Sequence, residues 1–168
     1  MKNIFVLSAL GFSCGLPYML VFSTLSAWLR DAGAALTVIG FISWAALTYS
    51  LKFLWSPFVD RIKMPLNQVV GQRRSWILMM QLLILILIMM MSQFDPISSL
   101  NFIVITAVLI AFFGSLQDIA VDAYRIELVS LDEQGNLAAS YQFGYRLAIL
   151  VATSLALIFA DFVSWQTV

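Results

Sequence analysis

Two carboxylates and a guanidinium lie close together in one apolar segment of the sequence: Asp118, Asp122 and Arg125. Steps of four and three residues place all three on one face of a helix. An ionisable group within a bilayer costs roughly 2.5 kcal/mol or more unless it pairs with another charge or lines a wet cavity. A carboxylate in such a cavity could take up a proton. We predict Asp118 as the proton-coupling group, and Asp122 as the second candidate, because Asp118 should lie deeper.

The composition predicts that these charges lie within a membrane protein. Of the 168 residues, 62% are hydrophobic and 11% are charged, whereas soluble domains have about 25% charged residues. The mean hydropathy is +0.95. The sequence therefore predicts an integral membrane protein. The formal net charge is zero, which gives no indication of nucleic-acid binding.

The inventory of reactive side chains argues against an enzyme. The sequence has no His and a single Cys, and no nucleophile–base constellation occurs outside the charged segment. One cysteine, Cys14, excludes an intramolecular disulfide and a cysteine-rich metal site. We therefore expect no catalytic residues, no metal and no cofactor.

Five apolar blocks are long enough to cross a bilayer as helices, and they lack the period-two alternation of β-barrel strands. They predict an all-α bundle with about five transmembrane helices. An uncleaved first helix is favoured over a signal peptide, because its apolar run exceeds the usual length of about 7–15 residues. The expected spans are 4–29, 36–58, 76–93, 101–124 and 137–162, with a cytoplasmic loop at 59–75.

The basic residues predict the orientation of the bundle. One set of helix ends carries most of them, and Arg30 alone falls at the opposite set. The positive-inside rule then places the N-terminus in the cytoplasm and residues 164–168 outside. Because the sequence stops after the fifth span without a polar tail, we expect a fragment of a longer polytopic protein. The basic residues at the cytoplasmic ends are Lys2, Arg61, Lys63, Arg73, Arg74 and Arg125.

Charges in other spans are candidate partners of the carboxylates. The second span contains Lys52 and the fifth contains Arg146, whereas the third is nearly all apolar and should face lipid. At 1.5 Å per residue, Arg146 lies ~22 Å along its helix and Asp118 ~15 Å along its own. These depths predict an Asp118–Arg146 pair and put Lys52 near the level of Asp122. Two interpretations remain open: an ion-pair lattice that holds the bundle together, or a polar cavity for an anionic substrate and a proton.

The first span combines small residues with a proline. Gly11 and Gly15 have the spacing that lets another helix approach closely. Pro17 removes a backbone hydrogen bond and can kink the helix. This pattern is typical of a packing surface with a tolerated proline, and a substrate gate is the alternative interpretation.

The segment after the second span resembles the loop motif of the major facilitator superfamily, in which a Gly-x-x-x-Asp-Arg segment and a Gly-Arg-Arg-like segment join two helices. The sequence departs from that motif at Ser56, which replaces the first glycine, and in the length of 62–70. Arg73 and Arg74 also fit a simple positive-inside anchor. The residues that carry the resemblance are Asp60, Arg61, Gly71, Arg73 and Arg74.

A longer pattern is similar to the AmpG-type muropeptide permeases of this superfamily. It extends in order along nearly the whole chain, and the related acetyl-CoA transporter branch shares parts of it. Six segments carry the resemblance: 10–17, 27–33, 49–57, 117–125, 144–146 and 164–166.

The resemblance implies a proton symporter of the cytoplasmic (inner) membrane that imports anhydro-muropeptides for peptidoglycan recycling. Such carriers have two six-helix halves with the substrate site between them. This chain would supply five helices of the N-terminal half, and its loop motif would act as a gate against the missing C-terminal half. The substrate-cavity candidates are then Lys52, Gln117, Tyr124, Arg125, Tyr145 and Arg146.

Other functions remain open at this stage. Transport by alternating access needs two bundles, so the chain could be a truncated or split product that is inactive alone. It could also be a membrane scaffold or a subunit that assembles with a separately encoded half. A carrier of another anionic substrate, such as an acyl-CoA, is a further alternative.

Overall fold

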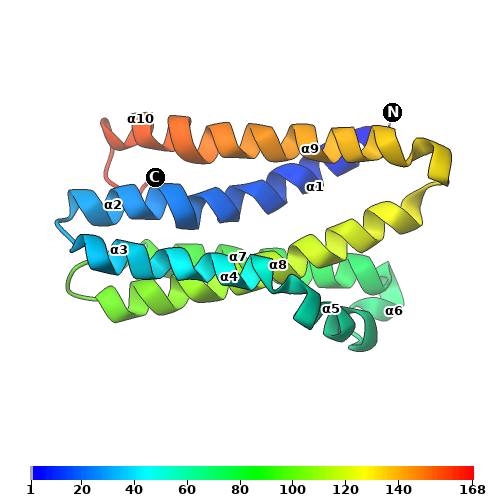
Figure 1. Cartoon of the computed structure of the whole chain (residues 1–168), viewed down its shortest axis with the longest axis horizontal. Coiled ribbons are helices and arrows are strands. Elements are labelled where there is room, and N and C mark those ends of the chain that lie inside the picture. Colours follow the sequence, from blue (N-terminus) through cyan, green and yellow to red (C-terminus); the bar gives the residue numbers. More distant parts are fainter. Residues whose placement is uncertain (1) are drawn as a thin grey trace.

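The computed structural model describes residues 2–168, and in this part of the chain every regular element is helical. The helices run roughly antiparallel in two layers, with α1, α2, α9 and α10 in one and α3, α4, α7 and α8 in the other (Figure 1). The elements are α1 (Lys2–Met19), η1 (Leu20–Thr24), α2 (Leu25–Asp31), α3 (Leu36–Ile42), η2 (Ser43–Ala45), α4 (Ala46–Ser50), α5 (Lys52–Arg61), α6 (Asn67–Val70), α7 (Gln72–Met91), α8 (Leu100–Leu128), η3 (Leu131–Glu133), α9 (Gln134–Leu150), η4 (Val151–Leu155) and α10 (Ala156–Ala160).

Four stretches are long and apolar enough to cross a membrane: Asn3–Asp31, Gln72–Met91, Leu100–Leu128 and Gln134–Ala160. They correspond to the first, third, fourth and fifth expected spans, and each helix extends beyond its apolar block at the end of the bundle where the N-terminus lies. The prediction of an all-α bundle of about five membrane helices is confirmed. The segment 59–75, expected as a loop, holds the end of α5, the short α6 and the start of α7.

The second expected span is not one continuous helix. Leu36–Ser50 and Lys52–Arg61 together are long and apolar enough to cross a membrane, but they are bent by 51° where they meet. Leu51 has φ −93° and ψ 10° at the break. The Trp55 indole donates to the Thr48 carbonyl at 3.2 Å, so a side chain takes up a carbonyl near the end of α4. The break makes Lys52 the first residue of α5.

Pro17 lies inside α1, and the helix continues beyond it to Asp31 through the π-helical turn η1. A second π-helical turn, η4, interrupts the fifth span at a corresponding level and contacts η1. The Thr24 hydroxyl donates to the carbonyl oxygen of Ala152 there. The two helices are thus joined by a polar contact in the half of the bundle where α2 and α10 lie.

The packing of α1 on α9 depends on three glycines, which we call the glycine seam: Gly11, Gly15 and Gly144. A Cβ at Gly11 would overlap the carbonyl of Tyr141, and one at Gly144 would overlap the carbonyl of Ser8. A Cβ at Gly15 would lie 2.9 Å from the Tyr145 carbonyl oxygen. The structure thus supports the packing interpretation of the small residues, and adds Gly144 on the partner helix.

The α7–α8 pair forms the core of the other layer. Helix α8 is the most enclosed span, with buried residues along most of its length. Helix α7 buries Trp76, Ile77 and Met80 and leaves an apolar outer stripe, as expected for a lipid-facing helix. Gln81, the one polar residue between Ile77 and Met91, points inward and donates to the Ser13 hydroxyl at 3.0 Å.

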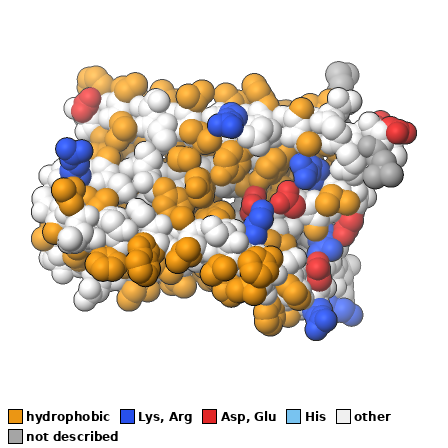
Figure 2. Space-filling view, in the orientation of Figure 1, with side chains coloured by type: hydrophobic (Ala, Val, Ile, Leu, Met, Phe, Trp, Pro, Cys, Tyr) orange, Lys and Arg blue, Asp and Glu red, His pale blue; other side chains and the backbone are white. Residues whose placement is uncertain are grey.

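The connections between helices alternate between the two ends of the bundle. The N-terminus, the α5–α6 region and the α8–α9 turn lie at one end, and the α2–α3 and α7–α8 turns lie with the C-terminus at the other (Figure 1). Charged side chains gather at the first end (Figure 2).

In the opposite α7–α8 turn, the backbone N–H groups of Ser98 and Ile97 donate to the Asp95 carboxylate, and these bonds lower the pKa of Asp95.

Cysteine labelling tests which end faces the cytoplasm. Lys63 and Ser98 are both exposed and lie in connections at opposite ends of the bundle. In a Cys14→Ser background, we expect Ser98→Cys to react with an impermeant maleimide on intact cells, and Lys63→Cys to react only after the membrane is permeabilised. Labelling of both positions on intact cells, or the reverse pattern, would contradict the orientation predicted from the basic residues.

Candidate functional site

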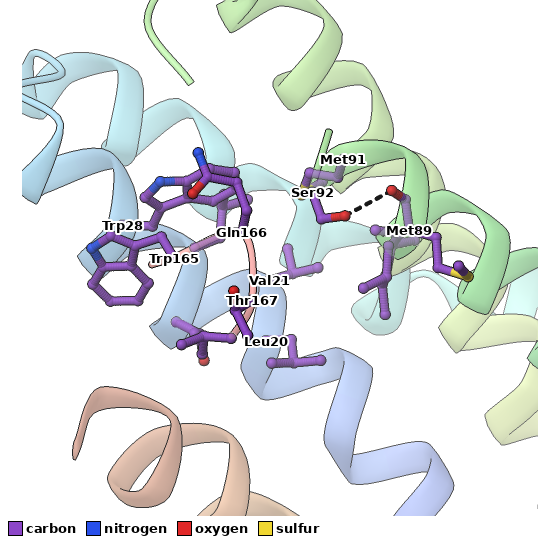
Figure 3. Close-up of a pocket in the computed structure, with 14 residues that line it drawn as sticks. Leu20, Val21, Trp28, Met89, Met91, Ser92, Trp165, Gln166 and Thr167 are labelled. Carbon is purple, nitrogen blue, oxygen red and sulfur yellow. Dashed lines mark hydrogen bonds between the residues drawn. The ribbon is translucent and has the colours of Figure 1, made fainter. Parts of the chain in front are cut away.

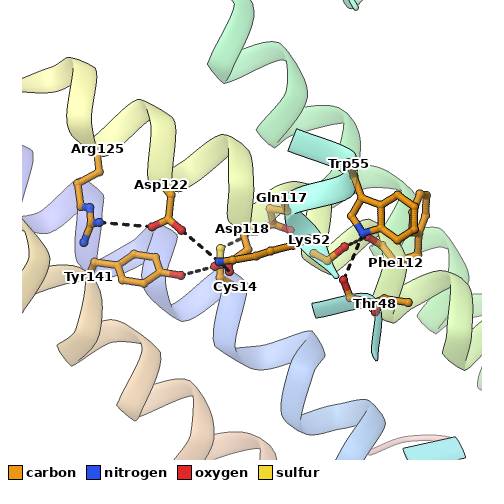
Figure 4. A network of polar contacts seen from close by, with 11 residues as sticks. Cys14, Thr48, Lys52, Trp55, Phe112, Gln117, Asp118, Asp122, Arg125 and Tyr141 are labelled. Atoms are coloured by element: carbon orange, nitrogen blue, oxygen red, sulfur yellow. Dashed lines mark hydrogen bonds and ion pairs between the residues drawn. The ribbon is translucent and has the colours of Figure 1, made fainter. Parts of the chain in front are cut away.

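The charged residues singled out from the sequence meet at the boundary between the two layers. Lys52 Nζ lies 2.8 Å from Asp118 Oδ2 and 3.4 Å from Asp122 Oδ2, and Arg125 Nη2 lies 3.5 Å from Asp122 Oδ1. The two aspartates and Arg125 project from one face of α8, as their spacing predicts, toward Lys52 (Figure 4). One lysine therefore bridges two carboxylates. The expectation that Lys52 lies near the level of Asp122 is confirmed.

Sequence reasoning missed Tyr141, which completes this group. Its hydroxyl donates to Asp118 Oδ1 at 2.6 Å, and its ring lies under the Arg125 guanidinium at 5.9 Å. Tyr141 is on α9, so this hydrogen bond joins the two helix layers (Figure 4). Its position in the sequence, three residues before Gly144 on the same side of the helix, is the signal that could have found it. We call Lys52, Asp118, Asp122, Arg125 and Tyr141 the ionic network.

The ionic network encloses Asp118 more than the other charges. The Asp118 side chain is 17% exposed, against 37% for Asp122 and 39% for Lys52. The order of burial agrees with the expectation that Asp118 lies deeper. With both carboxylates ionised, two negative charges face the two positive charges of Lys52 and Arg125, so the network is neutral. One added proton would leave a net positive charge.

The next layer of polar groups is buried behind Asp118. The Gln117 amide donates to the Ser13 hydroxyl at 3.0 Å and approaches the Cys14 sulfur at 3.5 Å. Ser13 also accepts from Gln81, so one hydroxyl joins α1, α7 and α8. The oxygen Gln117 Oε1 is buried without a hydrogen-bond partner among the described residues. Gln117 thus lies beneath the charged surface and supports the helices that position it.

The expected Asp118–Arg146 pair is wrong. Arg146 is exposed and makes no ion pair with the residues that the structure describes. The reason is its direction around α9. Gly144 packs against α1, and two residues further the helix has turned by about 200°, so Arg146 faces away from that contact. Depth along a helix had predicted the level of the two residues but not their direction.

The remaining cavity candidates are divided between two places. The Tyr145 ring lies 6.2 Å from that of Tyr141 and 6.5 Å from that of Tyr18, beside the ionic network. Tyr124 lies elsewhere: its ring is 5.5 Å from the Arg74 guanidinium, and its hydroxyl accepts from Arg74 at 3.4 Å. Tyr124 therefore contacts the loop motif and not Asp118.

The loop motif forms a second ionic group at the charged end. Arg73 Nη1 lies 2.6 Å from Asp60 Oδ1, and Arg73 Nε lies 2.9 Å from Glu127 Oε1. Sequence reasoning missed Glu127, which has no motif around it. Gly71 immediately precedes α7 and has a φ of 88°, a value that favours glycine. Arg61 is exposed and has no ion pair within residues 2–168.

A groove of about 460 Å³ connects the two ionic groups. The walls come from α5, α7 and α8, and they carry Lys52 and Asp122 at one end and Asp60, Arg73 and Glu127 at the other. The ionic network is therefore open to the charged end of the bundle. This geometry can hold a polar or charged group and exchange a proton with it, and it offers no nucleophile with a base.

Two other features bear on the chemistry. No group of three or more metal-ligating side chains occurs among the described residues. A smaller, mainly apolar hollow of about 260 Å³ lies near the opposite end of the bundle, and the neighbouring side chains of Trp28 and Trp165 help to line it (Figure 3). The Trp165 indole donates to Asp31 at 3.1 Å, so this hollow is partly closed by the C-terminal segment.

Comparison with known proteins decides the family. A family model described as acetyl-coenzyme A transporter 1 matches residues 3–164, almost the whole chain. The chain belongs to this transporter family. Its relatives also confirm the resemblance to the AmpG-type permeases. The family consists of transporters, which agrees with the absence of an enzyme-like constellation in the sequence.

Three relatives illustrate the match. A protein of Escherichia coli K12 named anhydromuropeptide permease is 41% identical over 162 residues, which cover 96% of this chain and 32% of the relative. An uncharacterised protein of Haemophilus influenzae is 38% identical over 167 residues, 99% of this chain and 39% of the relative. A Rickettsia felis protein whose name places it among the AmpG transporters is 36% identical over 166 residues, 98% of this chain and 40% of the relative. The chain thus spans about a third to two fifths of the length of the curated relatives it matches.

Proposed function

We propose that this chain forms the N-terminal part of a proton-driven carrier that imports anhydro-muropeptides across the cytoplasmic membrane, with its N-terminus in the cytoplasm. The observation that carries the proposal is the ionic network, in which Lys52 bridges two aspartates on an open groove. Intramembrane carboxylates and cations that face a cavity are typical of proton and substrate pathways. The relatives named as permeases support the transport function.

The charge balance of the network gives the carrier a mechanism. While Asp118 and Asp122 are both ionised, they neutralise Lys52 and Arg125, and neither of these two cations is free for a substrate. Proton uptake on Asp118 leaves a net positive charge beside the groove, which favours an anion. Release of the proton restores the neutral network and weakens that attraction. The proton and an anionic substrate are thereby bound in the same state of the carrier.

Two substrate classes share this electrostatic requirement. The family model is named for acetyl-coenzyme A, and a relative with 41% identity is named for anhydro-muropeptides. Both substrates are anionic. We favour the muropeptide, because the permease named for it is 41% identical to this chain and a second relative carries an AmpG transporter name. The second half of the carrier would supply the other wall of the site, as in transporters built from two bundles.

A chimera tests this function directly. Residues 1–168 replace the matching third of the Escherichia coli permease, and uptake of a labelled anhydro-muropeptide is measured in cells without a permease of their own. We expect the chimera to accumulate muropeptide, with uptake lost when the proton gradient is collapsed. The chain expressed alone should insert but not transport, because alternating access needs a second bundle.

The same cells distinguish the alternatives. Uptake of an acyl-CoA and not of the muropeptide by the chimera would assign the other substrate class. A correctly inserted chimera that transports neither compound would contradict the carrier function of this chain and favour a scaffold or an inactive product. Transport by the chain alone would show that a single copy or its oligomer suffices.

A further inference from the structure

Some basic side chains in the described part of the chain contact another side chain, and others lie near the ends of the bundle. Lys52 and Arg125 are paired with the aspartates of the ionic network, and Arg73 is held by Asp60 and Glu127. Arg74 lies on the Tyr124 ring. Three further basic side chains are near the ends of the bundle, where water is accessible: Arg30, Arg61 and Lys63.

Arg146 is the exception. It is 12 residues from the start of the continuous helix Gln134–Ala160 and 14 from its end, so it lies ~18 Å and ~21 Å from the two ends. That position is close to the middle of a bilayer, too far from either surface for its side chain to reach the headgroups easily. Arg146 is nevertheless exposed and has no carboxylate within ion-pair distance in residues 2–168. An arginine at this depth is costly unless a wet cavity or an anion compensates it.

Arg146 lies outside the ionic network, because five residues beyond Tyr141 the helix has turned by about 140°. The neighbouring Tyr145 ring packs 6.2 Å from that of Tyr141, which holds Asp118. Gln142, one turn earlier on the same flank of α9, is also exposed. The flank of α9 that carries Gln142 and Arg146 is therefore polar, whereas the flank with Phe143 and Leu147 is apolar and borders a hollow with α1.

We propose that Arg146 binds a carboxylate of the transported substrate. The planar guanidinium presents paired N–H donors that match the two oxygens of a carboxylate, and the low dielectric at this depth strengthens the interaction. A lipid phosphate does not reach the bilayer centre, so a carboxylate carried into a central cavity is the fitting partner. The site rests on the proposed function and deepens it: Asp118 takes the proton, and Arg146 recognises the anion.

The test compares two substrates in the chimera. One is an anhydro-muropeptide with free peptide carboxylates, and the other is the same compound with these groups converted to amides. We expect the unsubstituted chimera to prefer the free acid by at least about tenfold in KM, a typical effect for loss of a charged hydrogen bond. Arg146→Gln should raise KM for the free acid, leave KM for the amide nearly unchanged and so remove the preference. Arg146→Lys should restore part of it.

The controls separate recognition from folding and from proton coupling. Arg30→Gln removes an exposed arginine at the end of α2 and should alter neither KM. The pH dependence of uptake should be the same in Arg146→Gln as in the unsubstituted chimera, because the proton group is untouched. An equal loss for both substrates, or a preference that survives Arg146→Gln, would overturn the proposal.

A binding measurement separates the test of the Arg146 carboxylate site from the test of the carrier function. Calorimetric titration of the purified chimera with the free acid and with the amide does not require transport. If uptake is absent but the free acid binds in a manner that depends on Arg146, the carboxylate site stands and the carrier function fails. If uptake is present but binding and KM do not depend on Arg146, the carrier function stands and this site is wrong.

Discussion

Asp118→Asn in the chimera is expected to abolish accumulation of muropeptide against a gradient while leaving exchange of substrate across the membrane. Asparagine keeps the shape of the side chain, and its amide oxygen can still accept from Tyr141, which donates to Asp118 at 2.6 Å. It cannot carry a proton. Lys52 keeps a carboxylate partner, because Asp122 already lies 3.4 Å from its ammonium. The substitution therefore removes proton coupling with little loss of packing.

Three measurements define this result. Uptake driven by an imposed proton gradient should fall to the level of passive equilibration, and counterflow of labelled against unlabelled substrate should persist. Insertion should be unchanged. Tyr141→Phe is the matched control, because it removes the hydroxyl that holds Asp118 without removing the carboxylate. We expect it to retain accumulation, because the carboxylate that carries the proton stays in place. Unchanged accumulation in Asp118→Asn would exclude Asp118 as the proton group.

Helical spacing and membrane cost predicted the centre of this site from sequence alone. The spacing of Asp118, Asp122 and Arg125 places them on one face of a helix whatever the tertiary structure. Within an apolar span, these charges can be stabilised only by pairing with one another or by facing a wet cavity. The level of Lys52 followed from the rise per residue. These features depend on one helix at a time, which is why they could be derived.

The contacts that were predicted wrongly or missed depend on how the helices are rotated relative to one another. Arg146 and Asp118 lie at overlapping depths, but the Gly144 contact with α1 turns Arg146 away, and Tyr141 takes the place beside Asp118. The break at Leu51, which sets the direction of Lys52, was not predicted because neither a glycine nor a proline marks that position. Glu127 was missed because its partner Arg73 is 54 residues away in the sequence. Contacts of this kind depend on the packing of several helices and have no local pattern.

The glycine seam is where that packing is most sensitive, and Gly144→Ala should destabilise the bundle strongly. A Cβ at this position would overlap the backbone carbonyl of Ser8, which a side-chain rotation cannot move. Helices α1 and α9 must separate to make room, and overpacking of this kind costs about 1–3 kcal/mol. Separation would also draw Tyr141 away from Asp118, so proton-driven uptake by the chimera should fall together with stability.

Thermal unfolding in detergent measures this effect, with the buried thiol of Cys14 as the reporter, since a maleimide dye reacts with it only when α1 leaves the bundle. Gly135→Ala is the matched control. It makes the same substitution in the same helix at a site with no atom within 4 Å of the new Cβ, and it should be neutral or stabilise by about 0.5–1 kcal/mol through helix propensity. Gly11→Ala should behave like Gly144→Ala, because its Cβ would meet the Tyr141 carbonyl. Equal unfolding temperatures for Gly144→Ala and Gly135→Ala would show that α1 and α9 do not pack through these glycines.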